Sequence, residues 1–466
     1  MSDPRDNSTA PASGSTRMGS ITIVAIVVLI LAAVAVVIVV ATGSSSTKDL
    51  IPMKVLGGPV DASGQLLVIN VTAQRTLQLT GIDPSTQTPT WQTPYSASEI
   101  TLGQTFNPVS INGVAIDLAP TGAAGDPTVQ VKGVDVASGN VAWTANVTGV
   151  VSDAPATCIN DQYFCFSFKP VGTSTYGAGL MEISAANGSV LRVIPNSQRA
   201  LGTNLYETTA TTPAVMQISS AGTVLWTKSQ ASIFGELAHN SSGGWNIDVI
   251  GSMNVGSLGL TSTTSGYDMS HFSTTGFPVA TGVPSWSTQG MYNCMGSLEF
   301  LTSPVICKAN GTVSAPTGNA APDFSKVTLT LEGFNADSGA ITWSQPVTNV
   351  EPLLINKGVI LYDGNHIVVS VDGNARVLDT SNGSLARPGT GQLFWCASNP
   401  DLAVIAPPGF SAGNFRTASN HYTPCSVSGT TSSTTPQQQP AQVGVTLNGK
   451  FFWPTSGGIA YTTAAK

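Results

Sequence analysis

Residues 128–143 read Thr-Val-Gln-Val-Lys-Gly-Val-Asp-Val-Ala-Ser-Gly-Asn-Val-Ala-Trp, and this stretch decides the fold. Its first six residues alternate between polar and apolar or small side chains, which predicts a strand with one buried face. Asp135 then begins a turn, because its carboxylate accepts hydrogen bonds from the backbone N–H groups just ahead of it. Gly139 supplies the positive φ that a tight hairpin needs. The hairpin ends at Trp143, whose large side chain must pack on something beyond a single hairpin.

The same hairpin recurs along the chain. Two further clear copies cover residues 81–91 and 333–343, and each places an Asp or Asn eight residues before a Trp. Three weaker copies run from their anchor to the residue in the Trp position as follows: Ser184 to Arg192, Ser219 to Trp226 and Asp379 to Arg387. The anchors stand at positions 83, 135, 184, 219, 335 and 379, so the interval of 116 residues hides at least one degenerate copy. A period of about 45 residues with four short strands per repeat is typical of a β-propeller.

We therefore predict an all-β fold, a β-propeller of seven four-stranded blades, with eight blades as the alternative. Four tryptophans of the repeat are predicted to pack blade against blade: Trp91, Trp143, Trp226 and Trp343. Residues 443–463 regain strand character after a low-complexity stretch over 426–442, which we expect to be an exposed loop. A strand this late can pair with the first strand and close the ring.

The N-terminal region predicts a membrane anchor. Residues 21–41 are all apolar or Thr, and at about 1.5 Å per residue they span a bilayer core of about 30 Å. Arg5 and Arg17 precede this segment, which favours a cytoplasmic N-terminus and a propeller in the periplasm or extracellular space. We expect a single-pass protein of the cell inner membrane, with a disordered tail over 1–20, a transmembrane helix over 21–42, a linker over 43–54 and the propeller over 55–466. Cleavage of the segment as a signal peptide is the alternative.

Six cysteines agree with an exported domain, because an even number favours disulfides in an oxidising compartment. Partners close in sequence are expected, which pairs the six as follows: Cys158 with Cys165, Cys294 with Cys307, and Cys396 with Cys425. Buried free thiols are the alternative. The chain has no Cys-x-x-Cys, and its four histidines lie far apart without metal-type spacing, so no metal site is predicted.

The composition excludes several functions. Only 9% of the residues are charged, the formal net charge is −7 and no long basic run exists, which disfavours nucleic-acid binding. No nucleophile elbow or phosphate loop is present, so no catalytic residue is predicted. Aromatic residues on a polar stretch over 240–296 suit a ligand with an apolar body or sugar faces. The candidate ligand-binding residues are Trp245, Tyr267, Phe272, Trp286 and Tyr292. Their alternative role is to fill a divergent blade.

The Asp-x-x-x-Gly-x-x-x-Trp hairpin resembles the repeat of pyrroloquinoline-quinone-like propellers. This family includes the quinoprotein alcohol dehydrogenases and the outer-membrane assembly lipoprotein BamB. For a dehydrogenase the resemblance implies a quinone, a calcium ion and a disulfide between adjacent cysteines. The chain has no adjacent cysteines, so no cofactor is predicted. The layout is also similar to the actinobacterial periplasmic polar growth factor A type, which is linked to trehalose-mycolate lipid trafficking and polar growth.

Three kinds of function follow from these observations. The first is a non-catalytic, membrane-anchored binding or scaffold protein of cell-envelope biogenesis, whose partners would be an envelope membrane protein or lipid transporter and a glycolipid. The second is a BamB-like protein-assembly module that binds a partner chain. The third is an enzyme, either a quinone-dependent oxidoreductase or a glycan-active propeller.

Overall fold

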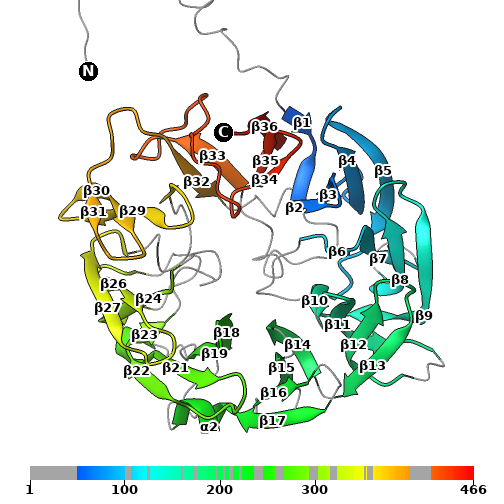
Figure 1. Ribbon diagram of the computed structural model, residues 1–466, viewed down its shortest axis with the longest axis horizontal. Helices are drawn as coiled ribbons and strands as arrows, with labels where there is room; N and C mark the ends of the chain where they lie inside the picture. The colour runs from blue at the N-terminus through cyan, green and yellow to red at the C-terminus, as the bar shows by residue number, and fades with distance from the viewer. Residues whose placement is uncertain are drawn as a thin grey trace, which may run out of the picture. The chain divides into compact units, whose positions relative to one another are not determined.

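Short antiparallel strands make up most of the described part of the protein, so the predicted all-β class is confirmed. The structure is a computed structural model. It describes the following residues: 50–99, 107–122, 126–158, 161–172, 176–195, 197–202, 205–208, 214–219, 223–235, 245–258, 267–292, 303–314, 323–350, 353, 360–398 and 421–465. Figure 1 shows four-stranded groups that follow one another around a ring, the arrangement of a β-propeller. We call each group a unit and name it by its strands.

The first four units are antiparallel meanders. Their strands are β2 (Lys54–Ala62), β3 (Gln65–Val71), β4 (Leu77–Asp83), β5 (Thr88–Tyr95), β6 (Ser110–Ile111), β7 (Val114–Pro120), β8 (Thr128–Asp135), β9 (Val141–Val151), β10 (Ala156–Cys158), β11 (Tyr163–Pro170), β12 (Gly179–Ser184), β13 (Val190–Pro195), β14 (Ser197–Gly202), β15 (Leu205–Thr208), β16 (Ala214–Ile218) and β17 (Val224–Ser229). The long strand β9 also pairs with β11, which joins two units into one eight-stranded sheet.

The later units follow the same plan with insertions. Their strands are β18 (Trp245–Ile250), β19 (Met253–Leu258), β21 (Ser273–Pro278), β22 (Trp286–Gln289), β23 (Met291–Tyr292), β24 (Val305–Asn310), β26 (Thr328–Phe334), β27 (Ile341–Val347), β28 (Ile360–Leu361), β29 (His366–Val371), β30 (Asn374–Asp379) and β31 (Leu385–Ala386). The additional elements are α2 (Gln230–Phe234), η3 (Met269–His271), the pair β20 (Tyr267–Asp268) and β25 (Thr312–Val313), and the strands β32 (Phe394–Ser398) and β33 (His421–Cys425), which extend the sheet at β28.

The first and last strands close the ring, as the sequence predicts. β1 (Leu50–Pro52) pairs with β36 (Gly458–Thr463), and β35 (Lys450–Thr455) and β34 (Val445–Leu447) complete this sheet. His421 Nε2 also lies 3.2 Å from the carbonyl oxygen of Val55, which ties β33 to β2. The sheet therefore contains both ends of the described chain and joins them in one unit.

Packing between neighbouring units buries side chains on both faces of some strands. On β8 the residues Val129 and Val131 are fully buried, as the alternating pattern predicts. On β26, however, Glu332 is also buried, although the alternation places it opposite Leu331 on an exposed face. The expectation of one buried face is therefore wrong for this strand, since packing between units covers its second face as well.

The turn chemistry is as predicted. Asp135 Oδ1 accepts hydrogen bonds from the N–H of Ser138 at 2.8 Å and from its hydroxyl at 2.6 Å, and the N–H of Gly139 donates to the carbonyl oxygen of Asp135. These two hydrogen bonds from Ser138 hold the pKa of Asp135 below its usual value. Gly139 has φ of +73°, the left-handed conformation that the hairpin requires.

A β-bulge between this turn and the tryptophan is a feature that the sequence analysis missed. Gly133 pairs with Trp143, whereas the next residue, Val134, pairs with Val141, so Ala142 is an additional residue in β9. The same register shift precedes Trp91 in β5 and Trp343 in β27. A bulge increases the local twist and changes the direction of a side chain, and here it accompanies the turn of each Trp toward the next unit.

Two predicted boundaries need correction. The linker predicted over 43–54 contains β1 and the start of β2, where Ile51 is 4% exposed; this strand is too short to show an alternating pattern. The stretch over 426–442 is not a fully exposed loop, because Pro436 and Pro440 are buried and the carbonyl oxygen of Gln438 accepts the indole N–H of Trp395 at 2.7 Å. A backbone carbonyl can satisfy a buried donor whatever its side chain is.

No helix among the described residues is long and apolar enough to cross a membrane. The predicted anchor over 21–42 and the tail over 1–20 lie outside the described residues, so both stay predictions.

Candidate functional site

The four predicted packing tryptophans all donate a hydrogen bond to the next unit. Each lies on an outer strand, and its indole N–H reaches a backbone carbonyl at or near the following turn. The acceptors are Val136 for Trp91 (2.7 Å), Ala185 for Trp143 (2.8 Å), Val279 for Trp226 (2.9 Å) and Thr380 for Trp343 (3.1 Å). The indole N–H of each ring is therefore hydrogen-bonded within the protein, and each ring joins two neighbouring units.

Glycines lie against both faces of the Trp143 ring. A Cβ atom on Gly133, in the strand beside Trp143, or on Gly188, in the turn of the next unit, would overlap the ring. In the later units Gly339 and Gly383 cover Trp286 and Trp343 in the same way. The glycines of the repeat therefore let the backbone approach a Trp ring closely, and those in the turns also supply the positive φ that the turn requires.

Trp286, predicted as a ligand-binding residue, belongs to this set of joints. Its indole N–H donates to the carbonyl oxygen of Ala336 at 2.8 Å, and Gly276 and Gly339 lie against its ring. It also packs edge-on against Phe334 of the next unit, with ring centroids 5.8 Å apart. The structure therefore supports the alternative that we gave for this residue, a filling role between units. The sequence signal was available, because Gly276 precedes Trp286 by ten residues, as Gly133 precedes Trp143.

Of the other predicted ligand-binding aromatics, only Phe272 has a described side chain, and it does not group with Trp286. Phe272 is half-buried and packs in a cluster with Met269 and Val313, whereas Trp286 belongs to a cluster with Val255 and Met291. Trp245, Tyr267 and Tyr292 are placed by their backbone only, at the starts of β18 and β20 and the end of β23, and their side chains lie outside the described part of the protein.

Two of the three predicted disulfides are confirmed. Cys158 is bonded to Cys165 and Cys396 to Cys425, with Cα–Cα distances of 6.0 and 5.9 Å. Cys307 is also disulfide-bonded, and its predicted partner lies outside the described residues.

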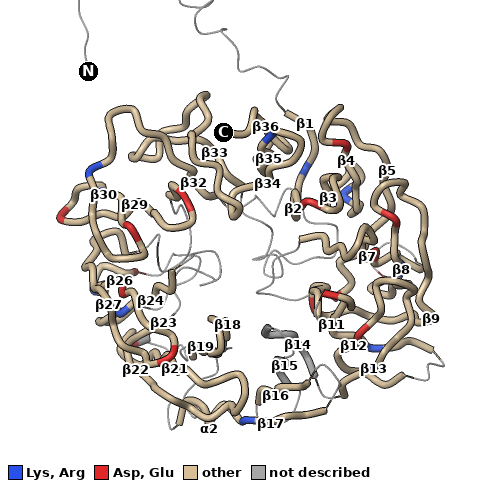
Figure 2. Tube along the Cα trace, viewed as in Figure 1, with Lys and Arg blue, Asp and Glu red and all other residues tan. Residues whose placement is uncertain are grey.

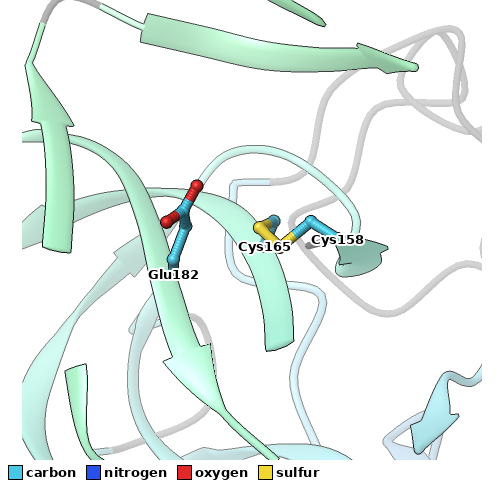
Figure 3. Close-up of side chains that lie close together, drawn as sticks. All are labelled: Cys158, Cys165 and Glu182. Carbon is cyan, nitrogen blue, oxygen red and sulfur yellow. A yellow bond between two sulfur atoms is a disulfide. The ribbon is translucent and has the colours of Figure 1, made fainter. Parts of the chain in front are cut away.

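The closest group of metal-ligand types in the described residues is Cys158, Cys165 and Glu182, shown in Figure 3. Its two sulfur atoms are bonded to each other, so neither is a thiolate ligand. Glu182, which is fully buried, is paired with Arg192: Nε to Oε2 is 2.5 Å and Nη2 donates to Oε1 at 3.0 Å. This group is therefore a disulfide beside an ion pair.

The pair of Glu182 and Arg192 shows one way in which the repeat varies. These two residues are cross-strand partners, at the position where Gly133 faces Trp143 in the preceding unit. Here an ion pair replaces the contact between Gly and Trp. In the following unit the Trp is kept and Gln217 stands opposite Trp226.

Asp117 is a buried carboxylate at a joint between units. It is 1% exposed on β7, accepts a hydrogen bond from the Thr93 hydroxyl of the preceding unit at 3.3 Å, and faces Lys132 across the sheet. Burial raises the pKa of Asp117 to about 7, against the opposing effects of Thr93 and Lys132. Because this carboxyl is buried between two units, its protonation affects the stability of the fold.

A cavity of about 360 Å³ lies where the ring closes, between residues 59–61 of β2 and residues 439–446. Its amide side chain, Gln439, is already used: Nε2 donates to the carbonyl oxygen of Thr463 and Oε1 accepts the N–H of Ala465. Asp61 Oδ1 accepts the N–H of Gly64. The cavity therefore offers few unused polar groups to a ligand.

Exposed aliphatic side chains recur on the outside of successive units. Val141, Val224 and Ile341 each stand two residues before a Trp, where the bulge leaves them in solvent although the Trp is covered. Val141 and Leu225 are 54% and 55% exposed. The full set is Val141, Val171, Leu191, Val224, Leu225, Val283 and Ile341. Figure 2 shows that charged residues are sparse along the trace, and the exposed residues of β9 are all uncharged.

Comparison with known proteins adds a limited result. No family model and no curated protein matches the chain. Similar solved structures include BamB from Moraxella catarrhalis, at 11% identity over 88% of this chain and 98% of that chain with a TM-score of 0.37. They also include the quinohemoprotein alcohol dehydrogenase from Comamonas testosteroni, at 12% identity over 75% and 72% with a TM-score of 0.41. A europium-containing methanol dehydrogenase matches at 11% identity over 73% and 72% with a TM-score of 0.31. At these values the likeness carries no argument about activity or partners.

Proposed function

We propose that this protein is a non-catalytic binding or scaffold protein of the cell envelope, tethered to the inner membrane by residues 21–42. Its propeller would bind an envelope membrane protein through the outer strands. The observation that supports this function is the recurring set of exposed aliphatic residues in an uncharged surface. Large apolar side chains that are held in solvent by a rigid frame are typical of protein–protein contacts.

The joints between units support a rigid frame of this kind. One hydrogen bond and two glycines hold each of Trp91, Trp143, Trp286 and Trp343, and one hydrogen bond and Gly282 hold Trp226, so the outer strands keep fixed positions relative to one another. We further propose eight units, the alternative to seven. The support is the count of four-stranded groups: one each from β2–β5, β6–β9, β10–β13, β14–β17, β18–β22, β23–β27, β28–β31 and β34–β36 with β1.

Site-specific photo-crosslinking in cells tests this function. A photoreactive residue at Val141 or Leu225 should crosslink to an envelope membrane protein, and one at Asp372, in the exposed turn between β29 and β30, should not. Equal crosslinking from all three positions would contradict the proposed surface. Stoichiometric quinone with calcium in the purified protein would instead support a dehydrogenase.

The finer assignment is the trafficking of trehalose-mycolate glycolipids together with a lipid transporter. It rests on the resemblance in layout alone. Lipid mass spectrometry of the crosslinked complex tests it, since a glycolipid and a transporter should be recovered together. Recovery of a protein-assembly machine without lipid would favour the BamB-like alternative.

A further inference from the structure

His366 departs from the repeat at a position where other units carry no metal ligand. It begins β29 and is the cross-strand partner of Asp379, the anchor of the following turn. The residue opposite the anchor is Val114 in the β6–β9 unit and Tyr163 in the β10–β13 unit. The repeat itself therefore does not require a histidine here.

The imidazole lies between two carboxylates. Its Nδ1 is 2.8 Å from Asp363 Oδ1, and its Nε2 is 3.9 Å from Asp379 Oδ2. The contact between His366 and Asp363 is a hydrogen bond, whereas the distance between His366 and Asp379 is too long for one. The side chains of His366 and Asp379 are 34% and 22% exposed, so an ion from solvent can reach the space between them.

We propose that His366 Nε2 and Asp379 Oδ2 bind a divalent transition-metal ion of the Zn²⁺ type, with water in the remaining positions. Zinc bonds to imidazole nitrogen and carboxylate oxygen are about 2.0–2.2 Å long, so two such ligand atoms lie roughly 3.3–3.6 Å apart in a tetrahedral site. The observed separation of 3.9 Å is slightly wider, and a shift of about 0.3–0.6 Å by one side chain would bring both atoms to the ion. Asp363 holds the other ring nitrogen, which is the arrangement that orients metal-binding histidines in proteins.

Both sides of the site are held in place by hydrogen bonds. Asp379 Oδ1 accepts the N–H and hydroxyl of Ser381, at 2.9 and 2.6 Å, and Asp379 Oδ2 accepts the amide of Asn382 at 2.8 Å. The N–H and hydroxyl of Thr380 both donate to the carbonyl oxygen of Asn365. The loop that carries His366 and the turn that carries Asp379 are thus already joined before an ion binds.

The ion would strengthen a joint between units. The turn with Asp379 includes Thr380, whose carbonyl accepts the Trp343 indole, and Gly383, which lies on the ring of Trp343. A metal bridge from His366 to Asp379 would fix this turn against the loop over 362–366. Binding to the folded state alone raises stability.

Calorimetric titration of the full-length protein with Zn²⁺, together with its thermal midpoint, tests the proposal. We expect one ion per chain and a higher midpoint with Zn²⁺. His366→Gln and Asp379→Asn should lose both effects, and Asp363→Asn should weaken binding about 10–100-fold. His271→Gln is the matched control, because His271 is exposed and lies near Asp268, and it should bind as the wild type does. No binding, or equal binding by His366→Gln, would overturn the site.

A second measurement needs no variant. Cu²⁺ added to the wild-type protein at one equivalent should give an electron paramagnetic resonance spectrum with one nitrogen ligand among oxygens. A spectrum with no nitrogen, or with several, would contradict ligation by His366 even where a substituted chain fails to fold.

Discussion

Gly133 and Trp143 provide the sharpest test of how the units are joined. A Cβ atom on Gly133 would lie within 2.6 Å of three ring atoms of Trp143. Carbon atoms in contact prefer about 3.5–4.0 Å, so the overlap is about 1 Å. The ring cannot retreat, because Gly188 covers its other face and the carbonyl of Ala185 holds its N–H at 2.8 Å. The substitution Gly133→Ala must therefore displace a ring that is fixed on three sides.

A double-mutant cycle isolates the part of the stability loss that comes from the overlap between residue 133 and the Trp143 ring. Gly133→Ala should lower the free energy of unfolding by about 1–3 kcal/mol, the usual cost of overpacking. In a Trp143→Val background the ring is absent, and the same change should be neutral or stabilising by up to about 1 kcal/mol, because Ala restricts the unfolded chain. The interaction between the two substitutions is then about 1–4 kcal/mol.

Urea denaturation followed by circular dichroism measures these free energies. Gly177→Ala is the matched control, since Gly177 is exposed, has no atom within 4 Å of a built Cβ, and should change stability by less than about 0.5 kcal/mol. If Gly133→Ala costs the same with and without Trp143, the steric explanation of the repeat is refuted.

Two further predictions concern buried charge and crosslinks. Because the pKa of Asp117 is raised to about 7, protonation of this carboxyl stabilises the folded state. This stabilisation is complete below the unfolded-state pKa of about 3.9 and is lost as pH rises through 7. It amounts to at most about 4 kcal/mol. Asp117→Asn should therefore flatten the fall in unfolding free energy between pH 4 and 8, and an unchanged slope would contradict the assignment. Replacing Cys396 and Cys425 by Ser should cost about 3–4 kcal/mol, because that bond closes a loop of 29 residues. The same change at Cys158 and Cys165, which are 7 residues apart, should cost about 2 kcal/mol, and the reverse order in a denaturation series would exclude the loop-closure explanation.

The surface of exposed aliphatic residues could be predicted only in part from the sequence. The aliphatic residues before each Trp are visible in it, but a strand without a bulge would place Val141 on the same covered face as Trp143. The ligand prediction for Trp286 overlooked the glycine ten residues before it. The pair of His366 and Asp379 was missed because only spacing along the chain was considered, whereas these residues are cross-strand partners.

The sequence by itself determined the local structure of this protein. Asp135, Gly139 and Trp143 specify a turn and a hairpin through the conformations and hydrogen bonds of neighbouring residues, and the repetition of the pattern specifies a ring. Only the tertiary structure decided what each side chain meets. The acceptor of a Trp lies about 40–50 residues further along, as with Trp91 and Val136. A one-residue bulge then decides whether a valine packs inside or faces solvent, because side chains in a strand alternate between its two faces.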